Sequence, residues 1–515
     1  MNKSWHKVLD SGAPADIGLM LEGTYPYVSG GVSSWVRQII EGFPQLTFAL
    51  VFLGGAQKHY GDIKYPLPPN VVHLEVHYLM DPQPGGKPHR KKGNPHVFAT
   101  VKELHEVLRS AHGTDLKWLM KNLVKELGQH HGIGLDSFLH SQEAWDQITD
   151  SYQDFCTEPT FVNYFWTVRI MHTPVFRLAA MTDSIPPVKV LHSISTGYAG
   201  FLAALLKHKR NIPFILTEHG IYTKERKIDL AQADWIEDPR EAFGSSLDAD
   251  VSYVRRLWIR FFEGIGRVAY DAANPIISLY EGNRLRQIED GAEKRRTRVI
   301  PNGIDLERFL PVRSARDKGV PPILALIGRV VPIKDIKTFI RAMRTICNTL
   351  PNAEGWIVGP EEEDEDYAAE CRSLVENLEL QNSVKFLGFR KVEDIFRKIG
   401  ILVLTSISEA LPLVILEGFA NGVPAVATDV GSCRELIEGG RPEDKELGMA
   451  GAVVPIASPE ATAQSALALL QNESAWYDAQ QAGLKRVKAY YTQKDMFANY
   501  GDIYREAFAA VERND

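Results

Sequence analysis

Two glutamates eight positions apart, Glu409 and Glu417, have the spacing and the setting to take part in chemistry. An apolar run, Ile401–Leu404, precedes them and is typical of a buried parallel strand. Pro412 suits the first turn of a helix, where its missing N–H has no partner to lose. We therefore predict a strand, a loop that holds Glu409, and a helix that holds Glu417 and runs to about Ala420.

Such a unit offers a site for a phosphorylated ligand that carries hydroxyl groups. In an open parallel α/β sheet, ligands bind beyond the carboxyl ends of the strands, and the N–H groups of a helix N-terminus attract anions such as diphosphate. A carboxylate in the same place can accept hydrogen bonds from vicinal sugar hydroxyls. Two solvated glutamates on an ordinary strand–helix unit would have the same spacing, so spacing alone favours that simpler interpretation.

The residues around the two glutamates favour the ligand site over two solvated glutamates. Residues 408–424 read S-E-A-x-P-x-x-x-x-E-G-x-A-x-G-x-P, which resembles the donor-binding signature of retaining glycosyltransferases of family 4, enzymes with the GT-B fold. The resemblance implies that Glu409 binds the sugar of a nucleotide sugar donor and acts in catalysis, and that Glu417 binds the ribose. It also assigns four residues between them to the donor site: Ala410, Leu411, Leu413 and Val414.

A second motif follows a strand that we expect at residues 323–327. Arg329 and Lys334 stand in the pattern G-R-x-x-x-x-K-D. An arginine can place two N–H groups on one phosphate, whereas a lysine acts as a point charge. A solvated basic pair is the simpler alternative, but the family has its diphosphate clamp at this place, and the resemblance implies the same role here.

A glycine pair opens the first expected helix, at residues 32–43, after an expected strand at residues 16–21. Gly30 and Gly31 would let the backbone approach a phosphate closely, although a plain tight turn would look the same. No GxGxxG motif is present, which disfavours a dinucleotide site. The family resemblance implies that the pair lies against the donor diphosphate or the acceptor.

Two histidines follow neighbouring expected strands. His219 stands in T-E-H-G, and the family has T-x-H-G at this point, with a histidine that approaches the donor sugar. His192 matches a less specific histidine after the preceding strand. Either one could instead be a hydrogen-bonded structural residue. Residues 298–305, R-V-I-P-N-G-I-D, resemble the family segment that enters the second domain, and Asn302 within it is a further candidate for the site.

Composition describes an ordinary globular enzyme and disfavours several other classes. The net charge is −7 and the pI about 6.1, which disfavours a nucleic-acid partner, although net charge does not report on a local basic patch. Four cysteines without CxxC spacing predict reduced thiols and neither a zinc site nor a disulfide framework. Residues 1–16 lack the apolar core of a signal peptide, and no apolar run approaches the ~20 residues of a membrane helix. We expect a soluble cytoplasmic protein.

The 515 residues are too many for one core, and two or three domains are expected. Strands alternate with helices through the second half, which predicts a doubly wound parallel sheet. The fold class is therefore α/β, and the resemblance implies GT-B architecture, with two Rossmann-like domains facing across a cleft. The predicted parts are an acceptor-side domain at 1–303, a nucleotide-sugar domain at 304–480, and a C-terminal helix at 481–515 that crosses back to the first domain.

Residues 98–179 are expected to form a helical insertion in the first domain, which the resemblance to the broad family does not cover. The segment is dense in aromatic side chains, which we expect to be core rather than a sugar platform: Trp118, Trp145, Phe161, Tyr164, Phe165 and Trp166. An acidic run at 361–366 is expected to be a solvated surface. Residues 222–252 are charged and have no regular apolar spacing, and we expect a loop plus a helix there.

The resemblance implies transfer of a sugar from a nucleotide diphosphate sugar with retention of anomeric configuration. Negative charge develops on the departing diphosphate, and Arg329, Lys334 and backbone N–H groups would stabilise it without a metal or other cofactor. In the family, the leaving phosphate is thought to deprotonate the acceptor on the same face. His219 would support the cationic sugar.

Residues 22–36, E-G-T-Y-P-Y-V-S-G-G-V-S-S-W-V, are similar to the opening of the cytoplasmic glycosyltransferases of bacterial Pel exopolysaccharide synthesis, a branch that also carries a helical insertion. This implies a UDP-sugar donor (UDP-glucose or a UDP-hexosamine), a polysaccharide acceptor, and peripheral attachment to a membrane-embedded synthase complex at the inner membrane. The alternatives are a nucleotide-sugar epimerase or a phosphorylase on the same fold, and a non-catalytic UDP-sugar-binding subunit. The presence of both glutamates and both clamp bases disfavours the last.

Overall fold

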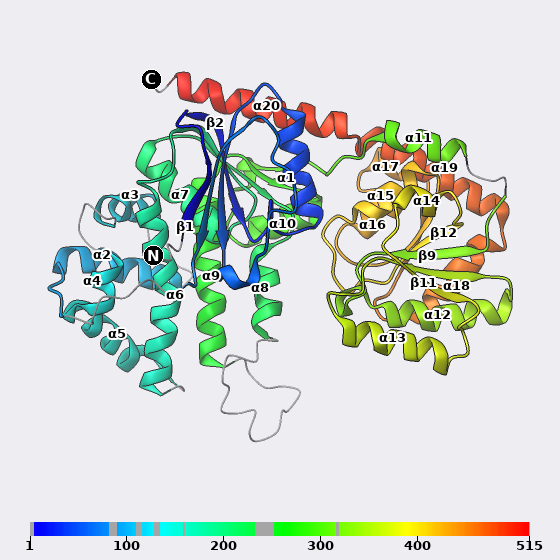
Figure 1. Ribbon diagram of the computed structural model, residues 1–515, viewed down its shortest axis with the longest axis horizontal. Coiled ribbons are helices and arrows are strands. Elements are labelled where there is room, and N and C mark those ends of the chain that lie inside the picture. The colour runs from blue at the N-terminus through cyan, green and yellow to red at the C-terminus, as the bar shows by residue number, and fades with distance from the viewer. Residues whose placement is uncertain are drawn as a thin grey trace. The chain divides into compact units, whose positions relative to one another are not determined.

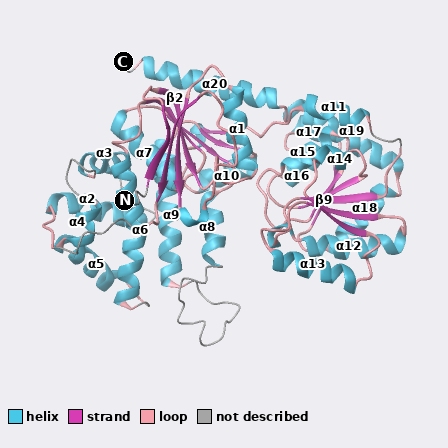
Figure 2. Cartoon of the chain, in the orientation of Figure 1, coloured by secondary structure: helices cyan, strands magenta, loops and turns pink. Residues whose placement is uncertain are grey.

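The computed structural model describes residues 5–81, 90–109, 116–127, 134–157, 160–231, 252–315 and 319–513 (Figure 1). The chain forms two compact units, each built around its own sheet with helices on both faces (Figure 2). The first unit comprises Met1–Ser278, Arg284–Val299 and Gly501–Asp515, and the second comprises Leu279–Asn283 and Ile300–Tyr500. The α/β class with two doubly wound sheets is confirmed, while the domain boundaries predicted at 303 and 480 stay predictions.

The first unit has an eight-stranded sheet in the order β1-β4-β3-β2-β5-β6-β7-β8, in which only β1 runs antiparallel to its neighbour. The strands are β1 (Trp5–Asp10), β2 (Ala15–Glu22), β3 (Phe48–Gly54), β4 (Val71–Tyr78), β5 (Val188–Ser193), β6 (Phe214–Glu218), β7 (Ile276–Ser278) and β8 (Thr297–Val299). Continuous apolar runs form the central strands because both faces are covered, and every residue of β3 is buried. Sequence patterning missed β1, an edge strand in which Val8 and Leu9 stay exposed.

Helices cover both faces of this sheet. They are α1 (Gly31–Gly42), α7 (Tyr198–Arg210), α8 (Tyr222–Ala231), α9 (Tyr253–Ala272) and α10 (Glu281–Glu289), and the C-terminal part of α20 (Gln493–Glu512) also belongs to the first unit. The amphipathic α1 buries Trp35, Val36 and Ile39 against the sheet. The helices α7 and α9 lie side by side on the face that the insertion covers (Figure 1).

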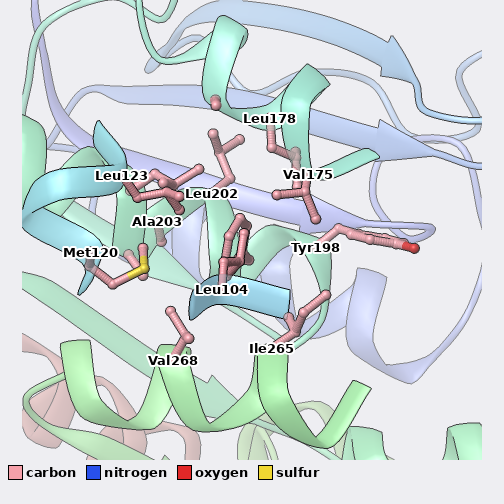
Figure 3. Close-up of a cluster of buried hydrophobic side chains, with 14 of the residues drawn as sticks. Leu104, Met120, Leu123, Val175, Leu178, Tyr198, Leu202, Ala203, Ile265 and Val268 are labelled. Carbon is pink, nitrogen blue, oxygen red and sulfur yellow. The ribbon is translucent and has the colours of Figure 1, made fainter. Parts of the chain in front are cut away.

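The predicted helical insertion is confirmed and consists of α2 (Pro95–Arg109), α3 (Leu116–Glu126), α4 (Leu135–His140), α5 (Gln142–Phe155) and α6 (Phe161–Met181). Aliphatic side chains join it to α7 and α9, as Leu123 beside Leu202 illustrates (Figure 3). The expectation that its aromatic residues form core is wrong for three tryptophans, Trp118, Trp145 and Trp166, which are 49%, 46% and 54% exposed. Tyr164 is core as predicted, at 1% exposed, whereas these three rings lie outside the interior.

The second unit has a parallel six-stranded sheet in the order β11-β10-β9-β12-β13-β14. The strands are β9 (Ile323–Ile327), β10 (Glu354–Val358), β11 (Val384–Gly388), β12 (Ile401–Leu404), β13 (Ala425–Thr428) and β14 (Gly451–Val454). The helices are α11 (Leu306–Ser314), α12 (Ile336–Thr349), α13 (Glu365–Asn377), α14 (Val392–Phe396), α15 (Leu413–Ala420), α16 (Cys433–Glu438), α17 (Pro442–Lys445), α18 (Pro459–Leu470), α19 (Glu473–Tyr490) and the start of α20. This strand order is that of dinucleotide-binding sheets.

Most of the segment 222–252, for which a loop plus a helix is predicted, lies outside the described residues, namely 232–251. In the part of the chain that the structure describes, no helix is long and apolar enough to span a bilayer. Nor do the described residues hold a group of three or more histidine, cysteine or acidic side chains placed to bind a metal ion.

Candidate active-site residues in the two units

The predicted donor residues of the second unit meet at the topological switch point of its sheet. The strands β9 and β12 are neighbours, and the chain winds away from them in opposite directions. Ligands bind to such sheets at this point, beyond the carboxyl ends of the strands. Arg329 and Lys334 follow β9, and Glu409 follows β12, so the fold brings two basic residues and a carboxylate to one edge.

An ion pair joins the two loops at this edge. The Nζ atom of Lys334 lies 2.5 Å from Oε1 of Glu409, and the hydroxyl of Ser406 donates to the same oxygen at 2.6 Å. The hydroxyl of Thr405 donates to the backbone carbonyls of Lys334 and Asp335, both at 2.9 Å. The side chains of Lys334 and Glu409 are only 22% and 14% exposed. The carboxylate predicted to bind sugar and a base predicted to bind diphosphate are therefore held together.

Arg329 has a different partner, which the sequence did not suggest. Its Nη1 atom lies 2.5 and 2.7 Å from the two carboxylate oxygens of Glu363. Glu363 belongs to the acidic run that we expected to be only a solvated surface. Both side chains are about half exposed, at 53% and 51%, and exposed pairs of this kind contribute little to stability. An anionic ligand could therefore replace the glutamate at low cost in free energy.

Tight backbone geometry fixes the loop that carries the two bases. A Cβ atom on Gly359 would lie 1.9 Å from the carbonyl oxygen of Gly328, so only glycine fits at position 359. Asp335 adopts a left-handed conformation (φ +45°) and its carboxylate accepts from the N–H of Thr338, which caps α12. The loop between Gly328 and Asp335 is thus anchored at both ends.

The helix α15 places the second glutamate. Pro412 is the residue before the helix rather than part of its first turn, a correction of one position to the predicted start. Leu413 and Val414 therefore supply the first N–H groups of α15, which are the groups available to an anion. Glu417 lies in the second turn, where burial raises the pKa of its carboxyl group to about 7. The helix ends at Asn421 and Gly422, as predicted.

The loop before α15 is fixed by the turn after β13. The N–H of Ser432 donates to the carbonyl oxygen of Ala410 at 2.8 Å. A Cβ atom on Gly431, which has a φ of +55°, would lie 2.4 Å from the carbonyl oxygens of Glu409 and Ala410. Position 431 therefore requires glycine, whereas position 432, where Ser432 has a φ of −88°, does not.

The first unit has a cavity of about 630 Å³ at the equivalent point of its own sheet, where β2 and β5 are neighbours. Glu22, the last residue of β2, lines it. One carboxylate oxygen of Glu22 accepts from the hydroxyl of Tyr222 at 2.8 Å, and the other accepts from the N–H of Ala199 at 3.1 Å, at the start of α7. A hydrogen-bonded carboxylate thus lies at the carboxyl ends of the strands in this unit too.

His219 also lines this cavity and has free hydrogen-bonding capacity. The side chain is 7% exposed, and neither ring nitrogen has a hydrogen-bond partner among the residues that the structure describes. Its ring packs edge-to-face against Trp35, with centroids 4.6 Å apart. Burial lowers the pKa of His219 to about 3, so the imidazole is neutral at physiological pH. A neutral ring can lie beside a cationic sugar without repulsion.

The neighbouring Glu218 holds the loop of His219 in place. Its carboxylate accepts from the hydroxyl of Tyr270 at 2.6 Å, from the side-chain amide of Gln287 at 3.0 Å and from the N–H of Tyr222 at 3.2 Å. These donors come from α9, α10 and α8. A single buried carboxylate therefore connects three helices to the end of β6.

His192 is placed differently from His219. Its Nδ1 atom lies 2.9 Å from the hydroxyl of Tyr504, and its Nε2 atom lies 2.9 Å from the hydroxyl of Thr217. The side chain is fully buried. Both ring nitrogens are occupied, which favours the structural interpretation of this residue.

The remaining predicted residues lie at backbone turns. Gly30 and Gly31 are exposed at the N-terminus of α1, and a Cβ atom on either would meet nothing within 4 Å. Open space lies before this helix, while the predicted contact with a donor or acceptor stays a prediction. Asn302 is buried, and its Oδ1 atom has no partner among the described residues. The next residue, Gly303, would place a Cβ atom 2.4 Å from the carbonyl oxygen of Thr492.

Sequence reasoning missed three functional candidates. Glu22, Tyr198 and Tyr222 line the cavity, and none was selected from the sequence. A carboxylate at the carboxyl end of the first strand was a usable signal for Glu22. The two tyrosines begin helices and lack any comparable local signal.

Two family descriptions match the chain. Residues 15–295 match the family described as "Domain of unknown function (DUF3492)", and residues 321–472 match "Glycosyl transferases group 1". A D-inositol 3-phosphate glycosyltransferase from Corynebacterium jeikeium is 29% identical over 159 residues, which are 28% of this chain and 38% of that protein. An Escherichia coli enzyme, UDP-Gal:alpha-D-GlcNAc-diphosphoundecaprenol alpha-1,3-galactosyltransferase, is 24% identical over 306 residues, 57% of this chain and 70% of that protein.

The fold is similar to that of solved GT-B glycosyltransferases. The structure of Anabaena Alr3699/HepE in complex with UDP and glucose superposes with a TM-score of 0.56 at 14% sequence identity, and the match covers 95% of this chain and 99% of that one. At this identity the likeness shows the fold alone. The chain matches 38% to 70% of the length of three curated relatives.

Proposed function

Because this chain belongs to the family described as "Domain of unknown function (DUF3492)" and its second unit matches group 1 glycosyl transferases, we propose that it is a retaining glycosyltransferase that uses a UDP-sugar. The proposed acceptor is a growing exopolysaccharide of the Pel type. The similarity of residues 22–36 to Pel glycosyltransferases supports that part of the proposal. It also supports a cytoplasmic location beside a membrane-embedded synthase complex.

The observation that carries the proposal is the Lys334–Glu409 pair at the switch point of the second sheet. A base for diphosphate and a carboxylate for sugar hydroxyls lie 2.5 Å apart, so one ligand that contains both groups can satisfy both side chains. A nucleotide diphosphate sugar is such a ligand. Glu417, one helix turn and a half into α15, is the proposed partner of the ribose hydroxyls.

The proposed reaction breaks the bond between the anomeric carbon and the diphosphate oxygen, and forms a bond from that carbon to an acceptor hydroxyl on the same face. The acceptor proton passes to an oxygen of the departing diphosphate. Positive groups aimed at this oxygen stabilise the charge that develops there. Arg329, Lys334 and the first N–H groups of α15 supply them, so the proposal requires no metal.

The carboxylate of Glu409 and the neutral ring of His219 are the proposed partners of the sugar as it becomes cationic. Lys334 neutralises Glu409 when no donor is bound, and the pair also keeps the carboxylate oriented. A contact to the reacting sugar strengthens as the bond to diphosphate breaks, and such contacts raise kcat. This is the basis for naming both residues catalytic.

Calorimetry with UDP, UDP-glucose, UDP-N-acetylglucosamine and UDP-N-acetylgalactosamine tests the proposal. We expect UDP and at least one UDP-sugar to bind, and slow release of UDP from that sugar in the presence of EDTA. Absence of UDP binding would contradict the proposal. Turnover that stops in EDTA and returns with Mg²⁺ or Mn²⁺ would contradict its metal-free form.

A further inference from the structure

The cavity of the first unit is lined by two unlike sets of side chains. One set is polar and includes Glu22, Ser195, His219 and Tyr222. The other is apolar and comes from several elements: Leu79, Met80, Ile170, Trp258 and Phe262. Figure 3 shows Tyr198 at the edge of the hydrophobic cluster, with its hydroxyl directed away from the labelled aliphatic side chains. The cavity is therefore suited to a ligand with a polar and an apolar part.

Three neutral polar groups in this cavity lack partners within the described part of the chain. They are the hydroxyl of Thr24, the hydroxyl of Tyr198 and both ring nitrogens of His219, and all these atoms are buried. Tyr198 and His219 are only 6% and 7% exposed. A buried polar group without a partner destabilises the fold unless a ligand or water supplies one. Their convergence on one cavity of about 630 Å³ indicates a ligand that carries several hydroxyl groups.

The apolar lining is partly open to solvent. Met80 is 44% exposed and Ile170 is 46% exposed, although both side chains are large and apolar. Trp258 and Phe262 stack beside them with ring centroids 5.8 Å apart. A ligand made only of hydroxyl groups would leave Met80 and Ile170 in contact with water, and an apolar part would cover them.

Ile170 also begins an exposed apolar stripe on the insertion. Val162, Trp166 and Ile170 are spaced four residues apart on α6, which places them on one face of the helix. They are 60%, 54% and 46% exposed, while Tyr164 and Val168 on other faces are buried. The stripe runs from Val162 to Ile170, eight steps of 1.5 Å or about 12 Å of helix. A contiguous exposed apolar surface that leads from a cavity indicates a bound partner.

We propose that the first acceptor, on which the exopolysaccharide of the proposed function begins, is amphipathic, with its sugar in the cavity of the first unit and an apolar aglycone along Val162, Trp166 and Ile170. The role of this ligand as an acceptor rests on the proposed function, whereas its binding to the first unit does not. The continuity of the stripe with the cavity at Ile170 is the reason to choose this occupant over a membrane surface or a second protein. The helical insertion then determines which acceptor the enzyme uses.

Binding of short alkyl glycosides to the full chain tests this inference. The probes are the methyl and hexyl glycosides of glucose, galactose and N-acetylglucosamine, and the measurement is calorimetry. We expect at least one hexyl glycoside to bind at least tenfold more tightly than its methyl counterpart, because each buried methylene strengthens binding about fourfold. We expect Trp166→Ser and Ile170→Ser to remove most of this gain.

A matched control is available on the same insertion. Trp118 lies on α3 and is 49% exposed, so Trp118→Ser removes a comparable surface away from the stripe and should keep the hexyl-to-methyl ratio. Tyr198→Phe should weaken binding of methyl and hexyl glycosides by the same factor, because it removes a buried cavity hydroxyl that only the sugar would contact. Unchanged melting temperatures of the two stripe variants show that they are folded.

The proposal is overturned if no glycoside of this set binds, or if hexyl and methyl glycosides bind equally. It is also overturned if Trp166→Ser and Ile170→Ser leave the ratio unchanged, which is the result expected of a stripe that serves a membrane or another protein. UDP affinity is measured on the same samples. Glycoside binding without UDP binding would contradict the proposed function alone, and UDP binding without glycoside binding would contradict this inference alone.

Discussion

The two units have the same strand order around their switch points but use those points in opposite ways. In the second unit, both bases at the edge of β9 and β12 already have a charged partner: Lys334 pairs with Glu409, and Arg329 with Glu363. In the first unit, the hydroxyl of Tyr198 and the ring of His219 have no hydrogen-bond partner among the described residues. The bases of the second unit are therefore paired, whereas these two neutral groups of the first unit are not.

This difference indicates what each edge binds. Unpaired buried charges are costly in free energy, so a site for diphosphate is expected to pair its bases internally when no ligand is bound. Leaving a neutral polar group without a hydrogen-bond partner costs less free energy. The polar groups of a site for a neutral, hydroxyl-bearing ligand can therefore lack partners before the ligand binds. The second unit is accordingly the donor side of the proposed reaction, and the first unit the acceptor side.

The largest effect is expected from Glu409→Ala. If Glu409 binds the sugar as it becomes cationic, the variant should lower kcat about 10²–10³-fold, the range found when one group that stabilises transition-state charge is removed. The KM for the donor should change little, because the contact strengthens only as the bond breaks. Steady-state kinetics with the best UDP-sugar measures both constants. A raised KM at unchanged kcat would place Glu409 away from the reacting sugar.

The next effect is expected from the two bases. Arg329→Ala and Lys334→Ala should each weaken UDP binding by roughly 1.5–3 kcal/mol, about 10- to 150-fold, the scale of a charge-assisted hydrogen bond. Lys337→Ala is the matched control, since Lys337 lies on α12 and pairs with Glu370 at the surface. Calorimetry that gives normal UDP affinity in both base variants would contradict the diphosphate clamp.

A smaller effect is expected from pH. Burial raises the pKa of Glu417 to about 7, above the ordinary value of a glutamate side chain, so without ligand its carboxyl group stays protonated up to a higher pH than it would in water. Hydrogen bonds from ribose hydroxyls favour the ionised form, so UDP binding should release a proton and weaken as the pH falls below 7. Between pH 8 and pH 6 we expect a loss of up to about tenfold, since one pH unit below the pKa corresponds to about 1.4 kcal/mol.

Glu417→Gln is the control for this pH dependence, because glutamine cannot ionise and UDP titrates by itself. The slope that remains in the variant belongs to the ligand. Identical slopes in the variant and the unmodified protein would show that Glu417 does not exchange its proton on UDP binding.

The smallest effect is expected from Glu363→Gln, which should strengthen UDP binding about two- to fivefold. The glutamate competes with diphosphate for Arg329, but the pair is half exposed, and such pairs contribute only about 0.2–1 kcal/mol. Glu361→Gln is a suitable control, because Glu361 pairs with Arg372 instead. Weaker UDP binding in Glu363→Gln would show that this carboxylate supports the clamp rather than competing with it.

The sequence predicted those features that short segments determine. Arg329, Lys334 and Glu409 follow strands whose apolar runs are unmistakable, and the sheet order then brings them together. Hydrogen-bond partners from distant segments were not predictable. The sequence around His192, for example, does not indicate a hydrogen bond to a tyrosine 312 positions away. The exposure of Trp166 was unpredictable for a related reason, since an aromatic residue on a helix does not reveal which face the rest of the chain covers.

The central claim is that the donor lies along the second unit with its ribose at Glu417 and its sugar at Glu409. Calorimetry of free UDP, which contains the ribose but not the sugar, tests it most directly in the variants Glu409→Ala and Glu417→Ala. We expect nearly normal UDP affinity for Glu409→Ala and clearly weakened affinity for Glu417→Ala. The reverse pattern would contradict the placement of the two carboxylates along the donor.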